Sequence, residues 1–134
     1  KRICSSSKSY VVTYKGHREN TSSQLKIREE LELYLSEEGF PKIYHILEKL
    51  GFKTTMVFTK TREIYAGKGV KASIDTLHGV GYYLELELDV NGDPVQFEEI
   101  VRKVLSELNA TIIEKTYLEI CLETGRCVKP QHLI

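Results

Sequence analysis

Two short segments of the sequence carry charged residues at alternate positions, and their charges are opposite. In GYYLELELDV, residues 81–90, Glu85 and Glu87 share one face of a predicted strand and the leucines share the other. In TKTREIY, residues 59–65 of a strand predicted over 54–65, Lys60 and Arg62 have the same spacing. Carboxylates are ligands of hard divalent cations, and lysine and arginine bind phosphate oxygens. A surface that combined these side chains would suit a polyphosphate chain and Mg²⁺ or Mn²⁺.

Three further segments show the same alternation and must position these groups. YVVTYK (10–15), QLKIREELELYL (24–35) and VKASIDT (70–76) are rich in residues typical of strands and end near turn residues. Their polar faces carry Thr13 and Lys15, then Lys26, Arg28, Glu30 and Glu32, then Ser73 and Asp75. Such faces often point to solvent in antiparallel sheets. Alternatively, the sheet curls so that they line a wet tunnel, with the apolar faces packed outward on helices.

The remaining segments indicate helices inserted between the strands. Ser36 is a suitable cap for a helix that ends at Leu50 before Gly51, and Asp93 with Pro94 begins a second helix that extends to Leu108. Residues 111–123 predict a strand followed by a short helix, with a loose tail after it. Strands joined by short turns, with helices between them, are typical of an antiparallel α+β domain.

The composition excludes several classes of function. The 19 basic and 19 acidic residues cancel, so no overall field would attract nucleic acid or an anionic membrane. No apolar run is long enough to span a bilayer, and no secretion signal is present. The three cysteines are odd in number and form no CxxC pair, which favours a reducing interior over a disulfide framework. We therefore expect a cytoplasmic protein, and a homodimer is compatible with the sequence.

Several segments, taken in order, resemble the CYTH domains, a family named for class IV adenylyl cyclases and thiamine triphosphatases. The matching segments are RIC with YVVTYKG, REELE, ILEKLGF, TKTREIY and SIDTLHGVGYYLELE, with a weaker match at KTYLE near Lys115. The resemblance implies an antiparallel β-barrel that forms a triphosphate tunnel, with the helices packed outside. The family's ExExK motif does not occur in this chain. We expect residues 1–134 to form a single CYTH-like domain that is incomplete at its N-terminus.

The resemblance also assigns roles to individual residues. It implies that phosphate is bound by Arg2, Lys15, Arg28, Lys60 and Arg62, of which Lys15, Lys60 and Arg62 would act in catalysis. It implies that the metal is bound by Glu85 and Glu87, assisted by Asp75, with Glu30 and Glu32 lining the same tunnel as metal-side groups. The last two could instead orient Arg28 or form a structural ladder of salt bridges across strands. Lys115 could be a further phosphate contact.

The activity implied by this resemblance is that of a metal-dependent enzyme acting on a small-molecule triphosphate. The family member it is most like is a class IV adenylyl cyclase, which converts ATP to cyclic AMP and pyrophosphate. A triphosphatase acting on thiamine triphosphate or inorganic tripolyphosphate is the first alternative. A non-catalytic module that binds polyphosphate or nucleotide is the second. The residues alone do not separate these three functions.

Overall fold

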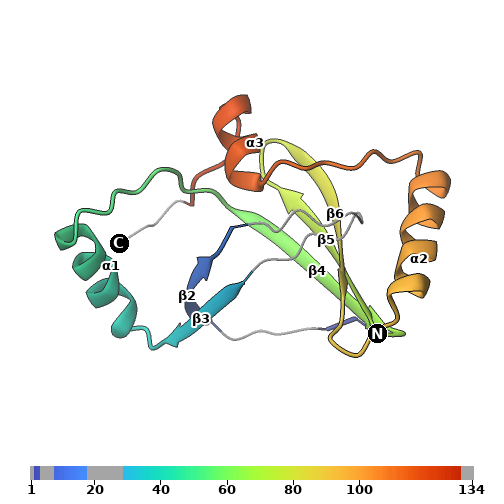
Figure 1. Ribbon diagram of the computed structural model, residues 1–134. Helices are drawn as coiled ribbons and strands as arrows, with labels where there is room; N and C mark the ends of the chain where they lie inside the picture. The colour runs from blue at the N-terminus through green and yellow to red at the C-terminus, as the bar shows by residue number, and fades with distance from the viewer. Residues whose placement is uncertain (1, 4–7, 18–28, 131–134) are drawn as a thin grey trace. The chain divides into compact units, whose positions relative to one another are not determined.

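The computed structural model describes residues 2–3, 8–17 and 29–130, and it describes the first two by their backbone only. These residues form strands and helices in the order of an α+β protein, as the sequence predicts (Figure 1). The strands are β1 (Arg2–Ile3), β2 (Tyr10–Lys15), β3 (Glu30–Leu35), β4 (Lys60–Gly67), β5 (Val70–Leu77) and β6 (Gly81–Leu88). The helices are α1 (Gly39–Lys49), α2 (Pro94–Glu107) and α3 (Tyr117–Thr124).

The described strands form two antiparallel sheets that belong to two compact units. One unit holds β1 and the chain from Thr54 onward, and its four-stranded sheet has the order β1-β4-β5-β6. The other unit holds the two-stranded sheet of β2 and β3, followed by α1. The prediction of antiparallel pairing is therefore confirmed. The pairings between described strands do not include those of a closed barrel.

The predicted boundaries are right for most elements and wrong for three. One of the three is α1, whose N-cap is Glu38 rather than the predicted Ser36. The strand β2 has the expected bounds. The cap of α2 is also as expected, since the side chain of Asp93 accepts a hydrogen bond from the backbone N–H of Val95 at 2.9 Å. The fourth strand begins at Lys60 rather than at Thr54. Residues 111–115 form no strand, although the short helix predicted after them is present as α3. Strand propensity depends on the tertiary context of a segment, so an apolar run alone does not fix a strand at 111–115.

A tight turn fixes the register of β4 and β5. Gly67 pairs with Val70, and the two residues between them, Lys68 and Gly69, both have positive φ, at 52° and 69°. This is the geometry of a two-residue hairpin turn whose twist matches that of the strands. The turn sets Arg62 directly opposite Asp75, the pair on which the candidate site depends.

The buried core of this unit lies where α3 packs against the end of β5. Leu77, Ile120 and Cys121 are buried together, and Met56, Phe58 and Tyr83 are among the residues that pack around them. Figure 1 shows α3 at the end of the sheet where β5 turns into β6. The turn has Gly79 at φ 85°, where a Cβ atom would collide with the carbonyl oxygen of Arg126. The chain after α3 therefore runs close against this turn.

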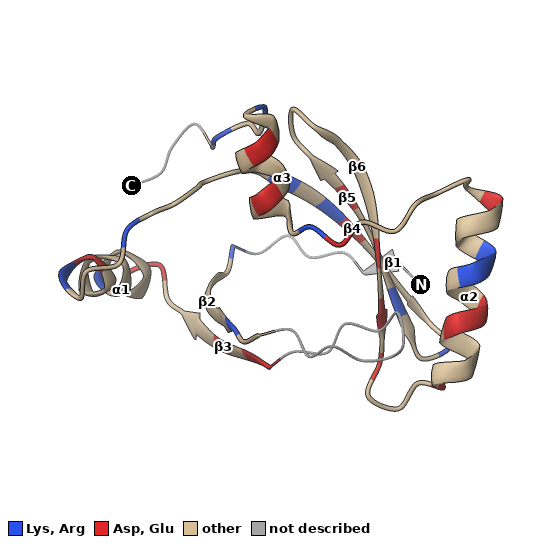
Figure 2. Ribbon diagram, turned by 45° about the horizontal axis from the view of Figure 1, so that its top comes forward, with Lys and Arg blue, Asp and Glu red and all other residues tan. Residues whose placement is uncertain are grey.

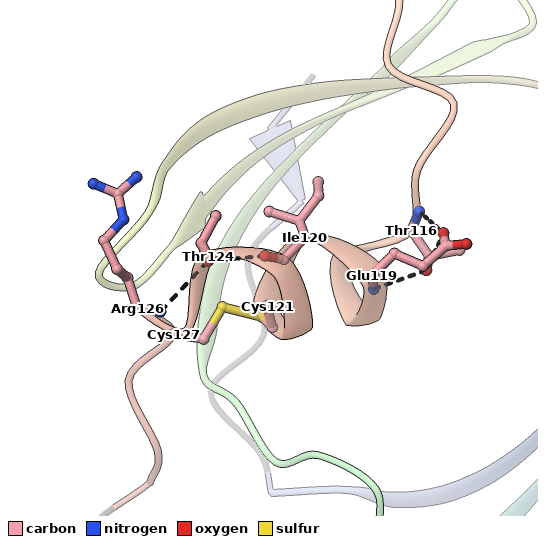
Figure 3. The surroundings of a disulfide bond; sticks show 7 residues. All are labelled: Thr116, Glu119, Ile120, Cys121, Thr124, Arg126 and Cys127. Carbon is pink, nitrogen blue, oxygen red and sulfur yellow. Dashed lines mark hydrogen bonds between the residues drawn. A yellow bond between two sulfur atoms is a disulfide. The ribbon is translucent and has the colours of Figure 1, made fainter.

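Cys121 and Cys127 form a disulfide, so the expectation that the cysteines are unpaired is wrong (Figure 3). The bond ties α3 to the segment that follows it. That segment in turn joins the sheet unit, because the Val128 backbone N–H donates to His78 and its carbonyl accepts from Thr59, both at 3.0 Å. Neither the number of cysteines nor their spacing predicted this pair. Cys121 lies in α3 and Cys127 follows it, beyond the left-handed Gly125 that ends the helix, so the pair depends on how the chain leaves α3.

Part of the apolar face of the four-stranded sheet is exposed, while residues at the centre of its polar face are buried. Ile74 and Tyr82, on the apolar face, remain 42% and 81% exposed, whereas Ser73 and Asp75, on the polar face, are 0% exposed. The prediction that helices cover the apolar face is therefore not met at these positions. None of the helices in the described residues is long and apolar enough to cross a membrane.

We expect the disulfide to contribute about 2 kcal/mol to the free energy of unfolding, because it restricts the unfolded chain over a sequence separation of six residues. The variant Cys127→Ala removes it and leaves the buried Cys121 side chain in place. Urea unfolding should show the loss, and a dithiol reductant should lower the midpoint of the wild type to that of the variant. A wild-type midpoint that does not respond to complete reduction would contradict this.

Candidate functional site

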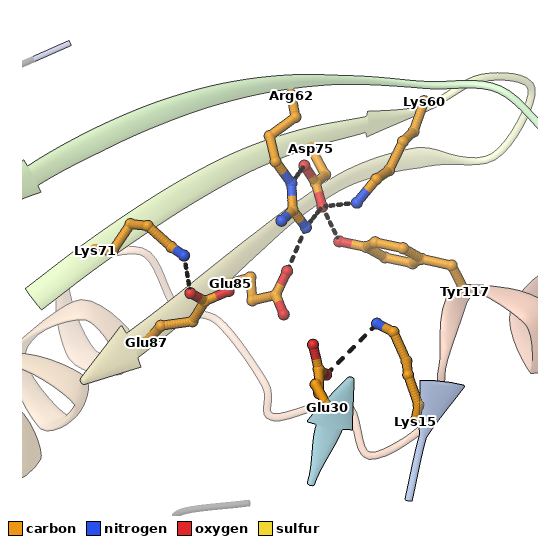
Figure 4. A network of polar contacts seen from close by, with 9 residues as sticks. All are labelled: Lys15, Glu30, Lys60, Arg62, Lys71, Asp75, Glu85, Glu87 and Tyr117. Carbon is orange, nitrogen blue, oxygen red and sulfur yellow. Dashed lines mark hydrogen bonds and ion pairs between the residues drawn. The ribbon is translucent and has the colours of Figure 1, made fainter. Parts of the chain in front are cut away.

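Charged residues from three neighbouring strands meet on one face of the four-stranded sheet. Directly opposite residues of antiparallel strands point to the same side, so the strand register decides which of them meet. It places Arg62 opposite Asp75, Ser73 opposite Glu85, and Lys71 opposite Glu87. Figure 2 shows charges of both signs along these strands, and Figure 4 shows their side chains converging. We call Lys60, Arg62, Lys71, Ser73, Asp75, Glu85 and Glu87 the charged face.

Asp75 is the centre of the charged face. Its side chain is fully buried and accepts four hydrogen bonds (Figure 4). Arg62 donates two of them, from Nε to Oδ1 and from Nη2 to Oδ2, both at 2.6 Å. Lys60 Nζ and the Tyr117 hydroxyl donate to Oδ2 at 3.3 and 2.7 Å. The carboxylate is therefore saturated by protein donors, which favours a role as an anchor for the cations over the predicted role as a metal ligand.

The donors around Asp75 decide its ionisation. Burial alone would raise the pKa of this carboxyl, but the hydrogen bonds from Arg62 and Tyr117 and the positive charges of Lys60 and Arg62 outweigh it and lower the pKa from 3.8 to about 2. The pKa of Arg62 is raised, chiefly by its hydrogen bond to Asp75. Burial, followed by the bond to Asp75, raises the pKa of Tyr117. At neutral pH the network therefore holds a carboxylate, two cations and a neutral phenol.

The two glutamates of β6 are each paired with a cation. Glu85 contacts Arg62, which thereby bridges it to Asp75, and Glu87 contacts Lys71. Lys71 was not among the predicted site residues, although it shares the alternation of Ser73 and Asp75 in VKASIDT, and this spacing could have revealed it. Tyr117 was also missed, and the only signal for it was the weak match at KTYLE.

The charged face fits a divalent cation at Glu85 and Glu87. Within the described part of the chain, no three His, Cys, Asp or Glu residues converge to form a complete protein-only site. Mg²⁺ commonly takes only one or two protein carboxylates and completes its shell with water and substrate phosphates. Two carboxylates two residues apart on one face meet that requirement. Beside them lies the Ser73 hydroxyl, which is buried and has no hydrogen-bond partner among the described residues.

The predicted residues of the other unit form a separate pair of contacts. Lys15 lies opposite Glu30 in the register of β2 and β3, and Lys15 Nζ is 3.6 Å from a Glu30 carboxylate oxygen. Glu32 lies opposite Thr13 and accepts a hydrogen bond from the Tyr34 hydroxyl at 3.2 Å. The Lys15–Glu30 contact agrees with the cross-strand ladder that was one of the alternatives, whereas the bond between Tyr34 and Glu32 lies within β3.

The other candidates are placed as follows. Arg28 lies outside the described residues. Arg2 is described by its backbone, which pairs with Tyr65 in β1 and β4. Lys115 donates from Nζ to Glu123 at 2.7 Å in an exposed pair next to α3. The structure therefore brings together Lys60, Arg62, Asp75, Glu85 and Glu87, and it adds Lys71, Ser73 and Tyr117 to them.

The chain belongs to the CYTH domain family, whose model matches residues 2–119. The resemblance of the sequence segments to this family is thereby confirmed. The chain is also similar to a protein of Methanocaldococcus jannaschii named "Putative adenylate cyclase", with 38% identity over 125 residues that cover 89% of this chain and 69% of that protein. No solved structure matches the chain significantly.

The variant Asp75→Asn should lower the free energy of unfolding at pH 7 by roughly 2–3 kcal/mol, because it leaves partly buried cations without their anion. Since the folded pKa of Asp75 lies below its ordinary value, its contribution is complete above pH 3.8 and is lost as the pH falls toward about 2. Urea unfolding from pH 7 to pH 2 should show the two proteins converging in acid. The exposed Asp89→Asn serves as the control, and a constant difference at every pH would refute the role of ionised Asp75.

Proposed function

We propose that the protein is a metal-dependent enzyme that acts on a triphosphate, most like a class IV adenylyl cyclase that converts ATP to cyclic AMP and pyrophosphate. The observation that carries the proposal is the charged face, on which Lys60, Arg62 and Lys71 lie among carboxylates. Membership of the CYTH family and the name of the M. jannaschii relative support it. The triphosphate tunnel, with Lys15, Arg2, Arg28, Glu30 and Glu32 in it, is part of the proposal through the family resemblance.

Three cations would bind the phosphate chain. Arg62 already makes a two-pronged contact with a carboxylate, and the same fork of N–H groups fits two phosphate oxygens. Lys60 and Lys71 add point charges on either side of it along the sheet face. All three are paired with carboxylates in the structure, so a triphosphate would replace those partners. The exchange keeps each cation paired, and the higher negative charge of the phosphates favours it.

Glu85 and Glu87 would hold Mg²⁺ or Mn²⁺, which when bound offsets the negative charge of the phosphates in the transition state. Carboxylates engaged in this way would release Arg62 and Lys71 for phosphate. Metal binding and triphosphate binding should therefore favour each other, since each removes the partner that competes with the other. Asp75 has a different role in this proposal, because it anchors Lys60 and Arg62 in the ligand-free protein.

In the proposed reaction the ribose 3′-oxygen attacks the α-phosphorus of ATP. The new bond joins the 3′-oxygen to phosphorus, the bond to the oxygen that bridges to the β-phosphorus breaks, and the hydroxyl proton passes to solvent. Lys60 and Arg62, with Lys15 by resemblance, would hold the phosphates for in-line displacement and stabilise the charge on departing pyrophosphate. In a triphosphatase, water would attack the terminal phosphorus, the bond from that phosphorus to the bridging oxygen would break, and phosphate, the shortened chain and a proton would be released while the same cations held the chain.

The direct test is incubation of the full-length protein with ATP, thiamine triphosphate and tripolyphosphate, each with Mg²⁺ or Mn²⁺. Cyclic AMP with equimolar pyrophosphate identifies the cyclase, and phosphate release identifies a triphosphatase. Turnover of none of the three would contradict the enzymatic proposal. Binding of tripolyphosphate without turnover would instead favour the non-catalytic module.

Replacing both proposed metal ligands, in Glu85→Gln plus Glu87→Gln, should lower the turnover of the preferred substrate by about 100-fold, because the charge of the phosphates is no longer offset. Calorimetry with Mn²⁺ should show the matching loss of metal affinity. A matched control is Glu98→Gln plus Glu107→Gln on the exposed side of α2, where both residues make surface ion pairs. Equal activity and equal Mn²⁺ affinity in both double variants would refute the metal assignment.

A further inference from the structure

Helix α3 brings a neutral donor to the most buried charge of the charged face. The Tyr117 hydroxyl donates to Asp75 Oδ2 at 2.7 Å, between residues 42 positions apart in the sequence (Figure 4). The centre of its ring is 5.0 Å from Lys60 Nζ, and the ring meets that of Tyr83 edge to face at 5.3 Å. Tyr117 therefore touches both the anchor and one of the cations that the anchor holds.

The position of Tyr117 is set by features outside the charged face. Thr116 and Glu119 form a reciprocal capping box at the start of α3. Ile120 is buried against Leu77, and the disulfide of Cys121 holds the other end of the helix. These contacts do not involve Lys60 or Arg62. The Tyr117 hydroxyl thus stays in place when the cations change their partners.

The need for such a donor follows from the burial of Asp75. A buried carboxylate that loses its hydrogen bonds incurs a large desolvation cost. If Lys60 and Arg62 turn toward phosphate, as the proposed function requires, they leave Asp75 with fewer donors. Tyr117 cannot be drawn to phosphate by charge, because its phenol is neutral, and burial together with the bond to Asp75 raises its pKa. It is the donor best suited to remain on Asp75.

We propose that Tyr117 is a positioning residue. It fixes the carboxylate of Asp75, and this carboxylate holds Lys60 and Arg62 where they can move to an anionic ligand. In the ligand-free protein the fixed carboxylate orients the guanidinium of Arg62. In the complex the Tyr117 hydroxyl compensates Asp75 for the donors that it loses. The effect on ligand binding rests on the proposed function, whereas the effect on Arg62 does not.

The test compares Tyr117→Phe with Tyr65→Phe. The first variant keeps the ring that packs on Lys60 and Tyr83 and removes only the hydroxyl. The second removes a hydroxyl that also donates to a carboxylate, that of Glu63 at 3.1 Å, but on the opposite face of β4. The two readouts are hydrogen exchange of the Arg62 Nε–H measured by NMR, assigned with Arg62→Lys, and the Kd for inorganic tripolyphosphate with Mg²⁺.

We expect about 10-fold faster exchange at Arg62 and about 10-fold weaker binding of tripolyphosphate in Tyr117→Phe, and neither change in Tyr65→Phe. Equal exchange at Arg62 in the wild type and both variants overturns the inference, and so does an unchanged Kd in Tyr117→Phe. A wild type that binds no tripolyphosphate defeats the proposed function instead. In that case the exchange rate at Arg62 still decides whether Tyr117 positions it.

Discussion

The carboxylate of Asp75 is the constraint on which the rest of the site depends. A fully buried negative charge is tolerated only when cations and hydrogen bonds compensate for its lost hydration. Arg62, Lys60 and Tyr117 provide that compensation from a neighbouring strand and from a helix. The same demand therefore fixes the two cations, requires the register that the turn between β4 and β5 sets, and requires α3 to pack beside the sheet.

This requirement also accounts for the unusual burial of the sheet. An apolar face is ordinarily the one removed from water, yet here the polar face contains the buried Ser73 and Asp75 while Ile74 and Tyr82 remain exposed. Glu85 and Glu87 extend the charged face onto the next strand, where each has a cation as its partner. Paired charges of this kind can exchange partners at low cost, which is the property that a site for metal and phosphate needs.

Helix α3 links the stability of the unit to the geometry of the site. Ile120 and Cys121 face the core, while Tyr117, one turn earlier on the same helix, reaches the charged face. The disulfide to Cys127 and the backbone bonds of Val128 secure the helix beside the start of β4. An eight-residue helix gains little from its own hydrogen bonds, so these tertiary contacts determine its position.

The sequence alone was sufficient to predict the strands and helices that are marked by side-chain periodicity or capping residues. The alternation in 81–90 and 59–65 predicted β6 and the part of β4 that bears Lys60 and Arg62. Asp93 with Pro94 predicted the start of α2. These predictions succeed because side-chain periodicity and capping depend on neighbouring residues only. The sequence also indicated the CYTH family. The hydrogen bond from Tyr117 to Asp75 and the pairing of Cys121 with Cys127 could be found only from the tertiary structure. Those contacts depend on strand register and on where α3 packs, and neither property can be recognised from a periodic pattern in the sequence.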